Sequence, residues 1–353
     1  MGDEQSIRVA LGDIVVAPAR IEAVHAKDAL VQVTLSVPRS EARAMEPMRA
    51  AAEAALARLP GVLSATVVLT AHSEPAAPAR KAAAGKGAML LPEVSKIVAI
   101  ASGKGGVGKS TTAVNLAVAL VEQGLRVGLL DADIFGPSLP QMLGTQEKPR
   151  VTGNRIHPIQ RWGLKAMSIG FLVEQETAMI WRGPMVMGAL EQMMGQVEWG
   201  ALDILVVDMP PGTGDAQLTM SQRVPLAGAV IVSTPQDVAL IDARRGVRMF
   251  EKVGVPVLGL IENMSYYYCP KCGERAEIFG HGGAEAEAAR LGCEFLGALP
   301  LKLAIRELAD AGTPIVAARP ESDEAAQYRA IAARVWAKLQ VEAAPAGPSI
   351  SFQ

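Results

Sequence analysis

The chain is organised around residues 94–112, VSKIVAIASGKGGVGKSTT. The stretch contains an apolar run, Ile97 to Ala101, whose length and composition predict a short buried strand. A glycine-rich turn follows, and beyond it apolar residues recur at helical spacing from Val114 to Leu120. This order of strand, turn and helix fits G-x-x-x-x-G-K-[ST] in full and predicts a phosphate-binding loop.

The residue types of this loop match the chemistry of a bound phosphate. Glycines let the backbone approach closely, with successive N–H groups directed inward, and the start of the helix adds its positive dipole end. Lys109 is placed to neutralise the β- and γ-phosphates, and the Ser110 hydroxyl to coordinate Mg²⁺. The loop residues predicted to bind the nucleotide are Gly103, Lys104, Gly105, Gly106, Val107, Gly108, Lys109, Ser110 and Thr111.

A second lysine, Lys104, stands directly after the first glycine of the loop. This feature resembles the "deviant" phosphate-loop families typified by MinD, ParA and the arsenite-pump ATPases. The resemblance implies that Lys104 reaches across a dimer interface to the partner's nucleotide and takes part in catalysis. It therefore implies a homodimer that depends on nucleotide.

Three aspartates follow predicted strands. Asp131 and Asp133 come after the strand predicted at 126–130, and Asp208 ends the apolar segment 202–208. Because the carboxyl ends of parallel strands face the ligand crevice, these carboxylates suit Mg²⁺ and water. Asp208 is expected to couple to Mg²⁺. The resemblance to the deviant families implies that Asp131 helps to hold the water shell of the metal and that Asp133 positions the attacking water.

Strands and helices alternate along the rest of the chain, with strands expected at 229–233, 257–263 and 295–299. The alternation predicts an α/β fold, a doubly wound and mainly parallel sheet. Asn263 lies at the end of one of these strands, and the resemblance implies that it hydrogen-bonds the adenine edge while Pro300 and Leu301 pack on the base. The chain has no separate Asn-Lys-x-Asp guanine-reading signature, so we predict ATP rather than GTP.

The chain is expected to divide into two domains and two connecting or terminal segments. Residues 1–70 predict a small α+β domain with strands at 14–16, 30–37 and 62–69 and a helix at 41–59. It resembles a PaaD-like domain, without cysteine after Pro38 or an Asp-Pro-Glu turn, so we expect it to bring no metal ligand. The remaining expected ranges are a flexible linker at 71–93, the P-loop ATPase domain at 94–340 and a disordered tail at 341–353.

Bulk composition excludes several classes of protein. The chain has 353 residues, half of them hydrophobic, and a formal net charge of −2 without a long basic run, which argues against nucleic-acid binding. No apolar stretch approaches the length of a membrane span, and the first residues do not resemble a secretory leader. Three cysteines argue against a disulfide framework. We therefore expect a cytoplasmic protein without a membrane partner.

Cys269 and Cys272 form a C-x-x-C pair in a loop after the Asn263 strand, and they are the candidate metal ligands. One such pair is half a site, because structural zinc and most clusters take four protein ligands. A two-fold dimer would supply four thiolates for one shared [4Fe–4S] cluster. Alternatively, Cys293 or His281 completes a zinc site within one chain, or the pair is a redox dithiol.

Four motifs together resemble the Mrp/ApbC family of iron–sulfur cluster carrier ATPases: GKGGVGKST, DADIFGPS, DMPPGTGD and IENMSYYYCPKCG. The resemblance implies an ATPase of slow turnover that holds a labile [4Fe–4S] cluster at a homodimer seam. It also implies a cluster-assembly scaffold and apo iron–sulfur client proteins as partners. Two other readings stay open, a MinD/ParA-like positioning ATPase without a cluster and a zinc-stabilised regulatory ATPase.

Overall fold

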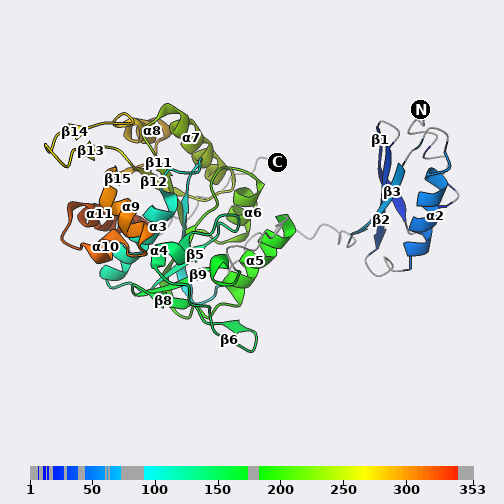
Figure 1. Cartoon of the computed structure of the whole chain (residues 1–353), viewed down its shortest axis with the longest axis horizontal. Helices are drawn as coiled ribbons and strands as arrows, with labels where there is room; N and C mark the ends of the chain where they lie inside the picture. The colour runs from blue at the N-terminus through cyan, green and yellow to red at the C-terminus, as the bar shows by residue number, and fades with distance from the viewer. Residues whose placement is uncertain are drawn as a thin grey trace, which may run out of the picture. The chain divides into compact units, whose positions relative to one another are not determined.

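The computed structural model of the protein describes residues 7, 11–12, 14–15, 19–27, 30–38, 44–59, 62, 64–72, 91–173 and 183–340. The chain forms two compact units, Met1–Ala83 and Ala84–Gln353, both drawn in Figure 1. No helix among the described residues is both long and apolar enough to cross a membrane.

The first unit contains a three-stranded sheet that packs against a helix. Its strands β1 (Arg20–Lys27), β2 (Leu30–Pro38) and β3 (Ser64–His72) lie in the order β1-β2-β3, and α2 (Glu46–Leu56) connects β2 to β3. β1 and β2 are antiparallel, whereas β2 and β3 are parallel. Alternate residues of β2 pack with one side of the helix in a small core, because strand side chains alternate between the two faces.

Several predicted boundaries in this unit are wrong. Residues 14–15, predicted as strand, form a turn in which the N–H groups of Ile14 and Val15 donate to the carbonyl of Leu11, at 3.1 and 2.9 Å. The first strand is instead β1, whose mixed sequence RIEAVHAK carries no clear alternation and is fixed by its pairing with β2. The helix is also five residues shorter at its start than predicted.

The predicted linker at 71–93 also differs from the structure at both ends. β3 continues through His72, where its pairing with Pro38 of β2 ends. Leu91 is buried in the core of the second unit, with 6% of its surface exposed. The middle of the range, 73–90, and the predicted tail, 341–353, lie outside the described residues.

The second unit is built on an eight-stranded sheet in the order β15-β12-β11-β4-β10-β5-β9-β8. All neighbouring strands are parallel except β8 and β9, and this confirms the predicted doubly wound α/β fold. The strands are β4 (Val94–Ala101), β5 (Val127–Asp131), β8 (Ile159–Arg161), β9 (Leu164–Ser168), β10 (Leu202–Asp208), β11 (Gly228–Ser233), β12 (Val257–Glu262) and β15 (Phe295–Ala298).

Helices cover both faces of this sheet (Figure 1). One core cluster joins the sheet to α3 (Lys109–Glu122), α4 (Leu139–Leu143), α9 (Leu303–Asp310), α10 (Ile315–Ala318) and α11 (Asp323–Gln340). A second cluster joins its other face to α5 (Gly183–Gly195), α6 (Asp215–Arg223), α7 (Asp237–Lys252) and α8 (Gly283–Leu291). The central strands are buried on both faces, which explains why their sequences are continuous apolar runs.

The strand order brings the predicted site residues together. β10 lies between β4 and β5, and Asp208 at its end is level with Ile100 of β4 and Asp131 of β5. The phosphate loop leaves β4 at the same edge. Three segments that are about 30 to 110 residues apart in the sequence therefore end side by side, at the crevice where open α/β sheets bind ligands.

Candidate functional site

The phosphate loop runs from the end of β4 to the first turn of α3, and its glycines are required by its backbone. Gly106 and Gly108 have φ angles of 81° and 80°, in the left-handed region that favours glycine. Gly103 packs against α7 so closely that an added Cβ atom would lie 2.1 Å from the carbonyl oxygen of Asp242. The loop is also closed by Ser102, whose hydroxyl donates to the Lys104 carbonyl at 2.8 Å.

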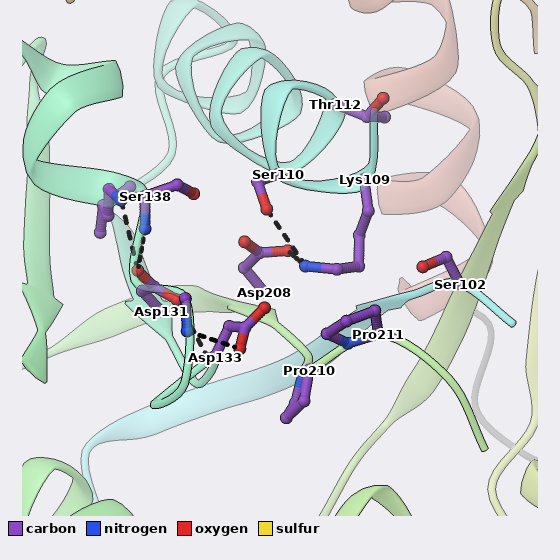
Figure 2. Close-up of polar contacts among 12 residues, drawn as sticks. Ser102, Lys109, Ser110, Thr112, Asp131, Asp133, Ser138, Asp208, Pro210 and Pro211 are labelled. Carbon is purple, nitrogen blue, oxygen red and sulfur yellow. Dashed lines mark hydrogen bonds and ion pairs between the residues drawn. The ribbon is translucent and has the colours of Figure 1, made fainter. Parts of the chain in front are cut away.

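Lys109 and Asp208 form a buried ion pair in the middle of the site (Figure 2). Their side chains are 6% and 4% exposed. Lys109 Nζ also donates to the Ser110 hydroxyl oxygen at 3.1 Å. The lysine predicted to meet the phosphates, the predicted magnesium ligand Ser110 and the predicted acid Asp208 are thus in direct contact.

Asp131 is fully buried and accepts four hydrogen bonds. One comes from the N–H of Asp133 at 3.0 Å, and the others reach its second oxygen. Those donors are the N–H groups of Ser138 and Leu139, at 3.2 and 3.3 Å, and the hydroxyl of Ser168, at 3.0 Å. Burial raises the pKa of Asp131 to about 7, the negative charge of Asp208 adds to the shift, and the hydrogen bonds oppose it.

Asp208 has a raised pKa as well, because the cost of burying its charge outweighs the effect of Lys109. The buried carboxyl groups of Asp131 and Asp208 therefore lie at neighbouring strand ends, and the Lys109 ammonium pairs with that of Asp208. Their oxygens and the Ser110 hydroxyl are hard donors of the kind that Mg²⁺ prefers. These residues are therefore suited to a magnesium ion, because a divalent cation would offset the excess negative charge of the two carboxylates.

Asp133 and Lys104 are more accessible than the buried group. The Asp133 carboxylate is half-buried and accepts a hydrogen bond from the Gly136 N–H at 3.2 Å. Figure 2 shows it beside Pro210 and Pro211, in the loop after β10. That loop is tied to the phosphate loop, because the N–H of Gly212 donates to the Ser102 carbonyl at 2.9 Å. Lys104 is exposed.

A cavity of about 370 Å³ opens beside the start of α3. Gly108 and Thr111 line it on the phosphate-loop side, and Asn263, Pro300 and Leu301 line it elsewhere. The structure thus gathers the residues predicted to contact an adenine base around one cavity. The side-chain amide of Asn263 also donates a hydrogen bond of 2.8 Å to the Val107 carbonyl, a contact that the sequence did not predict.

Cys269 and Cys272 lie in a hairpin between β13 (Tyr267–Tyr268) and β14 (Arg275–Ala276). The Cys269 N–H donates to the Glu274 carbonyl at 2.9 Å and the Gly273 N–H donates to the Cys269 carbonyl at 2.8 Å. Cys272 is exposed and Cys269 is half-exposed. Hydrogen bonds to the Cys269 sulfur lower the pKa of the Cys269 thiol. The largest contribution comes from the Cys272 N–H and the next from the Lys271 N–H. Thiolates are the form that binds metals.

A third ligand within the chain is missing from this hairpin. The described residues contain no group of three or more His, Cys, Asp or Glu side chains that could hold a metal. Cys293 instead contacts the Ala288 carbonyl of α8, with Sγ at 3.7 Å, and His281 Nδ1 lies 3.5 Å from Glu277. The reading in which Cys293 or His281 completes a zinc site within one chain therefore finds no support in the described part of the chain.

Sequence reasoning missed two residues that position others, Ser168 and Glu262. Ser168 donates to Asp131 from the end of β9, 37 residues along the chain, and no local pattern marks it. Glu262, next to Asn263, is a buried carboxylate that contacts Ser265 and α8. An acidic residue ending a buried strand is a signal that could have singled it out.

The sequence matches two described families. Residues 93–336 match the family described as NUBPL iron-transfer P-loop NTPase, and residues 10–67 match the family described as iron-sulfur cluster assembly protein. The chain is 55% identical to the iron-sulfur cluster transfer protein NUBPL of Dictyostelium discoideum over 251 residues, which cover 70% of this chain and 78% of that protein.

Two further comparisons agree with this match. The iron-sulfur cluster carrier protein of Escherichia coli strain K12 is 53% identical over 262 residues, covering 74% of this chain and 71% of the relative. Among solved structures, the nucleotide-binding protein of Archaeoglobus fulgidus in complex with ADP shares 40% identity with a TM-score of 0.59. That similarity covers 67% of this chain and 93% of the solved one.

Proposed function

Since the chain belongs to the NUBPL iron-transfer family of P-loop NTPases, we propose that it is an iron–sulfur cluster carrier driven by ATP. In this proposal the cluster is cargo: a labile [4Fe–4S] cluster is held between two copies of the chain and then transferred to an apo-protein. A MinD/ParA-like positioning ATPase without a cluster is the less favoured alternative, because the relatives named above are cluster transfer and carrier proteins.

The single observation that carries the proposal is the isolated, accessible thiol pair. Cys269 and Cys272 share one hairpin, and the described residues offer no third ligand within the chain. A cubane cluster takes four thiolates. A two-fold axis beside the hairpin supplies the second pair from an identical surface, because an isologous interface places the same residues on both sides. Homodimerisation is therefore part of the proposal.

The nucleotide site is proposed to bind ATP with Mg²⁺ and to hydrolyse it slowly. Mg²⁺, when bound, would neutralise charge on the β- and γ-phosphates. Ser110 and Asp208 would hold the ion, and Asp131 its water shell. Lys109 would leave its pairing with Asp208 to contact the phosphates. Asp133 would orient the attacking water.

Two further assignments complete the nucleotide site. Lys104, which is exposed at the edge of the loop, would reach the nucleotide of the partner copy. The cavity beside Thr111 would take the adenine, with Asn263 on its edge and Pro300 against its face. These assignments give a role to the exposed lysine and to the cavity, neither of which takes part in the buried ion pair.

The proposed partners follow from the chemistry of a carrier. A labile cluster has to be received from a cluster-assembly scaffold and delivered to apo iron–sulfur proteins. The match of residues 10–67 to an iron-sulfur cluster assembly family supports a role for the first unit in contacting one of these partners. With the ends of the linker moved to agree with the structure, the proposed ranges of the two domains are 1–72 and 91–340.

Anaerobic reconstitution tests the proposal. The full chain is incubated with iron and sulfide, and iron, sulfide and native mass are then measured. We expect about four iron and four sulfide per dimer. The double variant Cys269→Ala/Cys272→Ala should lose the cluster, and Cys293→Ala, which removes the third cysteine, should retain it.

Two results would overturn the assignment. One is a cluster content in the double variant equal to that of the wild-type protein. The other is stoichiometric zinc bound to a monomer, because that would make the hairpin a structural metal site.

A further inference from the structure

The segment that joins the base cavity to the cysteine hairpin is held from both sides. Asn263 and Met264 line the cavity, and Asn263 donates to the Val107 carbonyl in the phosphate loop at 2.8 Å. Two residues further on, the N–H of Ser265 donates to the Leu299 carbonyl at 2.9 Å. The N–H of Leu301, another cavity residue, donates to the Tyr266 carbonyl at 2.7 Å. The first residues of the hairpin segment thus belong to the wall of the nucleotide site.

Met264 shows that this segment is under constraint. Its φ angle is 55°, in the left-handed region that residues other than glycine rarely adopt. Such a conformation persists only where surrounding contacts fix it. The hydrogen bonds of Asn263 and Ser265 on either side supply those contacts.

Glu262 connects this wall to the far end of the hairpin segment. Its side chain is buried, with 1% of the residue exposed. One oxygen accepts from the Ser265 hydroxyl at 2.6 Å and from the Gly282 N–H at 3.3 Å. The other accepts from the Ala284 N–H at 2.7 Å, in the first turn of α8. Ser265 precedes the two cysteines and Gly282 follows them, so a single carboxylate holds both ends of the segment that carries them.

We propose that Glu262 is a positioning residue that couples nucleotide binding to the cysteine hairpin. It is the neighbour of Asn263, which contacts the phosphate loop, and it fixes both ends of segment 265–282. A change at the phosphate loop that moves Asn263 is therefore passed to both ends of the hairpin at once, and it alters the exposure of Cys269 and Cys272. This inference rests on the proposed function for its meaning, since it names how the nucleotide regulates the thiol pair.

The test measures thiol reactivity in the apoprotein and needs no cluster. Alkylation rates of Cys269 and Cys272 are followed by peptide mass spectrometry with and without Mg–ATP. Because the ligand orders the wall to which the hairpin is tied, we expect saturating Mg–ATP to slow alkylation in the wild-type protein by about fivefold or more. In Glu262→Gln the neutral amide cannot accept from all three donors, so the nucleotide response should fall to about twofold or less.

Two controls distinguish a loss of coupling from a loss of folding: the ATP affinity of Glu262→Gln, and a matched variant at another buried glutamate. Glu262→Gln should bind ATP within about threefold of the wild-type affinity, because the carboxylate does not line the cavity. Glu287→Gln is the control: Glu287 is also a buried glutamate and lies in α8, the helix whose first turn Glu262 contacts, but it pairs with Arg244 and Arg290 rather than with the hairpin ends. It should keep the full nucleotide response.

A milder variant covers the case in which Glu262→Gln does not fold. Ser265→Ala removes only the hydroxyl contact, and it should weaken the response without abolishing it. The inference is overturned if Mg–ATP leaves the thiol reactivity of the wild-type protein unchanged. It is also overturned if the thiols of Glu262→Gln respond to Mg–ATP as those of the wild type do. If Glu262→Gln does not fold, the same response in Ser265→Ala overturns it. Neither outcome depends on cluster binding, so failure of this coupling and failure of the cluster assignment are distinguishable.

Discussion

Lys109 and Asp208 lie 99 positions apart in the sequence and form an ion pair from which water is almost excluded. The strand order makes this contact possible, because β10 ends beside the strand from which the phosphate loop leaves. Buried ion pairs are costly to break, since the charge that remains is left without a partner. The pair therefore ties the stability of the second unit to the residue that is proposed to bind phosphate.

Replacing the lysine alone should destabilise the second unit. We expect Lys109→Met to lower its free energy of unfolding by about 3–5 kcal/mol at pH 8, because Asp208 keeps a buried, unpaired charge. Urea unfolding followed by tryptophan fluorescence measures this unit selectively, since all four tryptophans lie beyond residue 160. The double variant Lys109→Met/Asp208→Asn removes both charges and should recover most of the loss; equal instability of the two variants would contradict this account.

Lys104 is expected to matter for hydrolysis and not for folding. Because it is exposed, Lys104→Ala should change the free energy of unfolding by less than about 0.5 kcal/mol. Its ATP hydrolysis should fall by about 100-fold or more, since a cation on the transferring phosphate is removed.

Mixing two inactive variants tests whether Lys104 acts on the partner's nucleotide. Equal amounts of Lys104→Ala and Asp133→Asn chains would form about half heterodimers, each with one intact site. We expect roughly a quarter of the wild-type hydrolysis rate to return. If Lys104 serves its own chain's nucleotide, the mixture stays inactive.

Asp131 should make the stability of the second unit depend on pH. Its pKa is about 7 in the folded protein, against an ordinary value of 3.8. Between these values the folded protein holds more protons at this carboxyl than the unfolded chain does, so the free energy of unfolding falls as the pH rises through that window. The total effect is about 4 kcal/mol, of which about 3 kcal/mol falls between pH 5 and pH 8. Urea unfolding at pH 5, 6, 7 and 8 measures it.

Two substitutions check the origin of that pH dependence. Asp131→Asn has no charge to bury, so its free energy of unfolding should change less between pH 5 and pH 8 than that of the wild type. Asp203→Asn is the control, because hydrogen bonds from Arg126 lower the pKa of Asp203 to about 2, outside this range. The free energy of unfolding of Asp203→Asn should change with pH as that of the wild type does. If Asp131→Asn also keeps the wild-type pH dependence, the effect belongs to another group.

The glycines of the phosphate loop should differ in their tolerance of a methyl group. In Gly103→Ala the new Cβ atom would lie 2.1 Å from a backbone oxygen of α7, so either the loop or the helix has to move. We expect a loss of about 1–3 kcal/mol in the free energy of unfolding, as for an overpacked core. Gly105→Ala is the matched control, because the nearest atom to its Cβ is a Pro211 carbon at 4.0 Å. Thermal unfolding of both variants decides the point.

Much of the second unit could be predicted because its signals are local. The apolar segment 202–208 is β10 with the same bounds, and the glycine-rich turn is the phosphate loop. These elements are set by hydrophobic runs and by glycine positions that a single stretch of sequence displays. β1 was missed because its residues gain their strand conformation from pairing with β2 rather than from a pattern of their own.

The residues alone were enough to predict a phosphate loop, two strands of a parallel sheet that end in aspartate, and one isolated C-x-x-C pair. Three contacts became visible only in the folded chain: Lys109 pairs with Asp208, Ser168 donates to Asp131, and Glu262 holds both ends of the cysteine segment. The physical reason is the range of the interactions. Strand and loop formation follow from neighbouring residues, whereas the partners of a buried charge are set by strand order and register, which bring distant residues into contact.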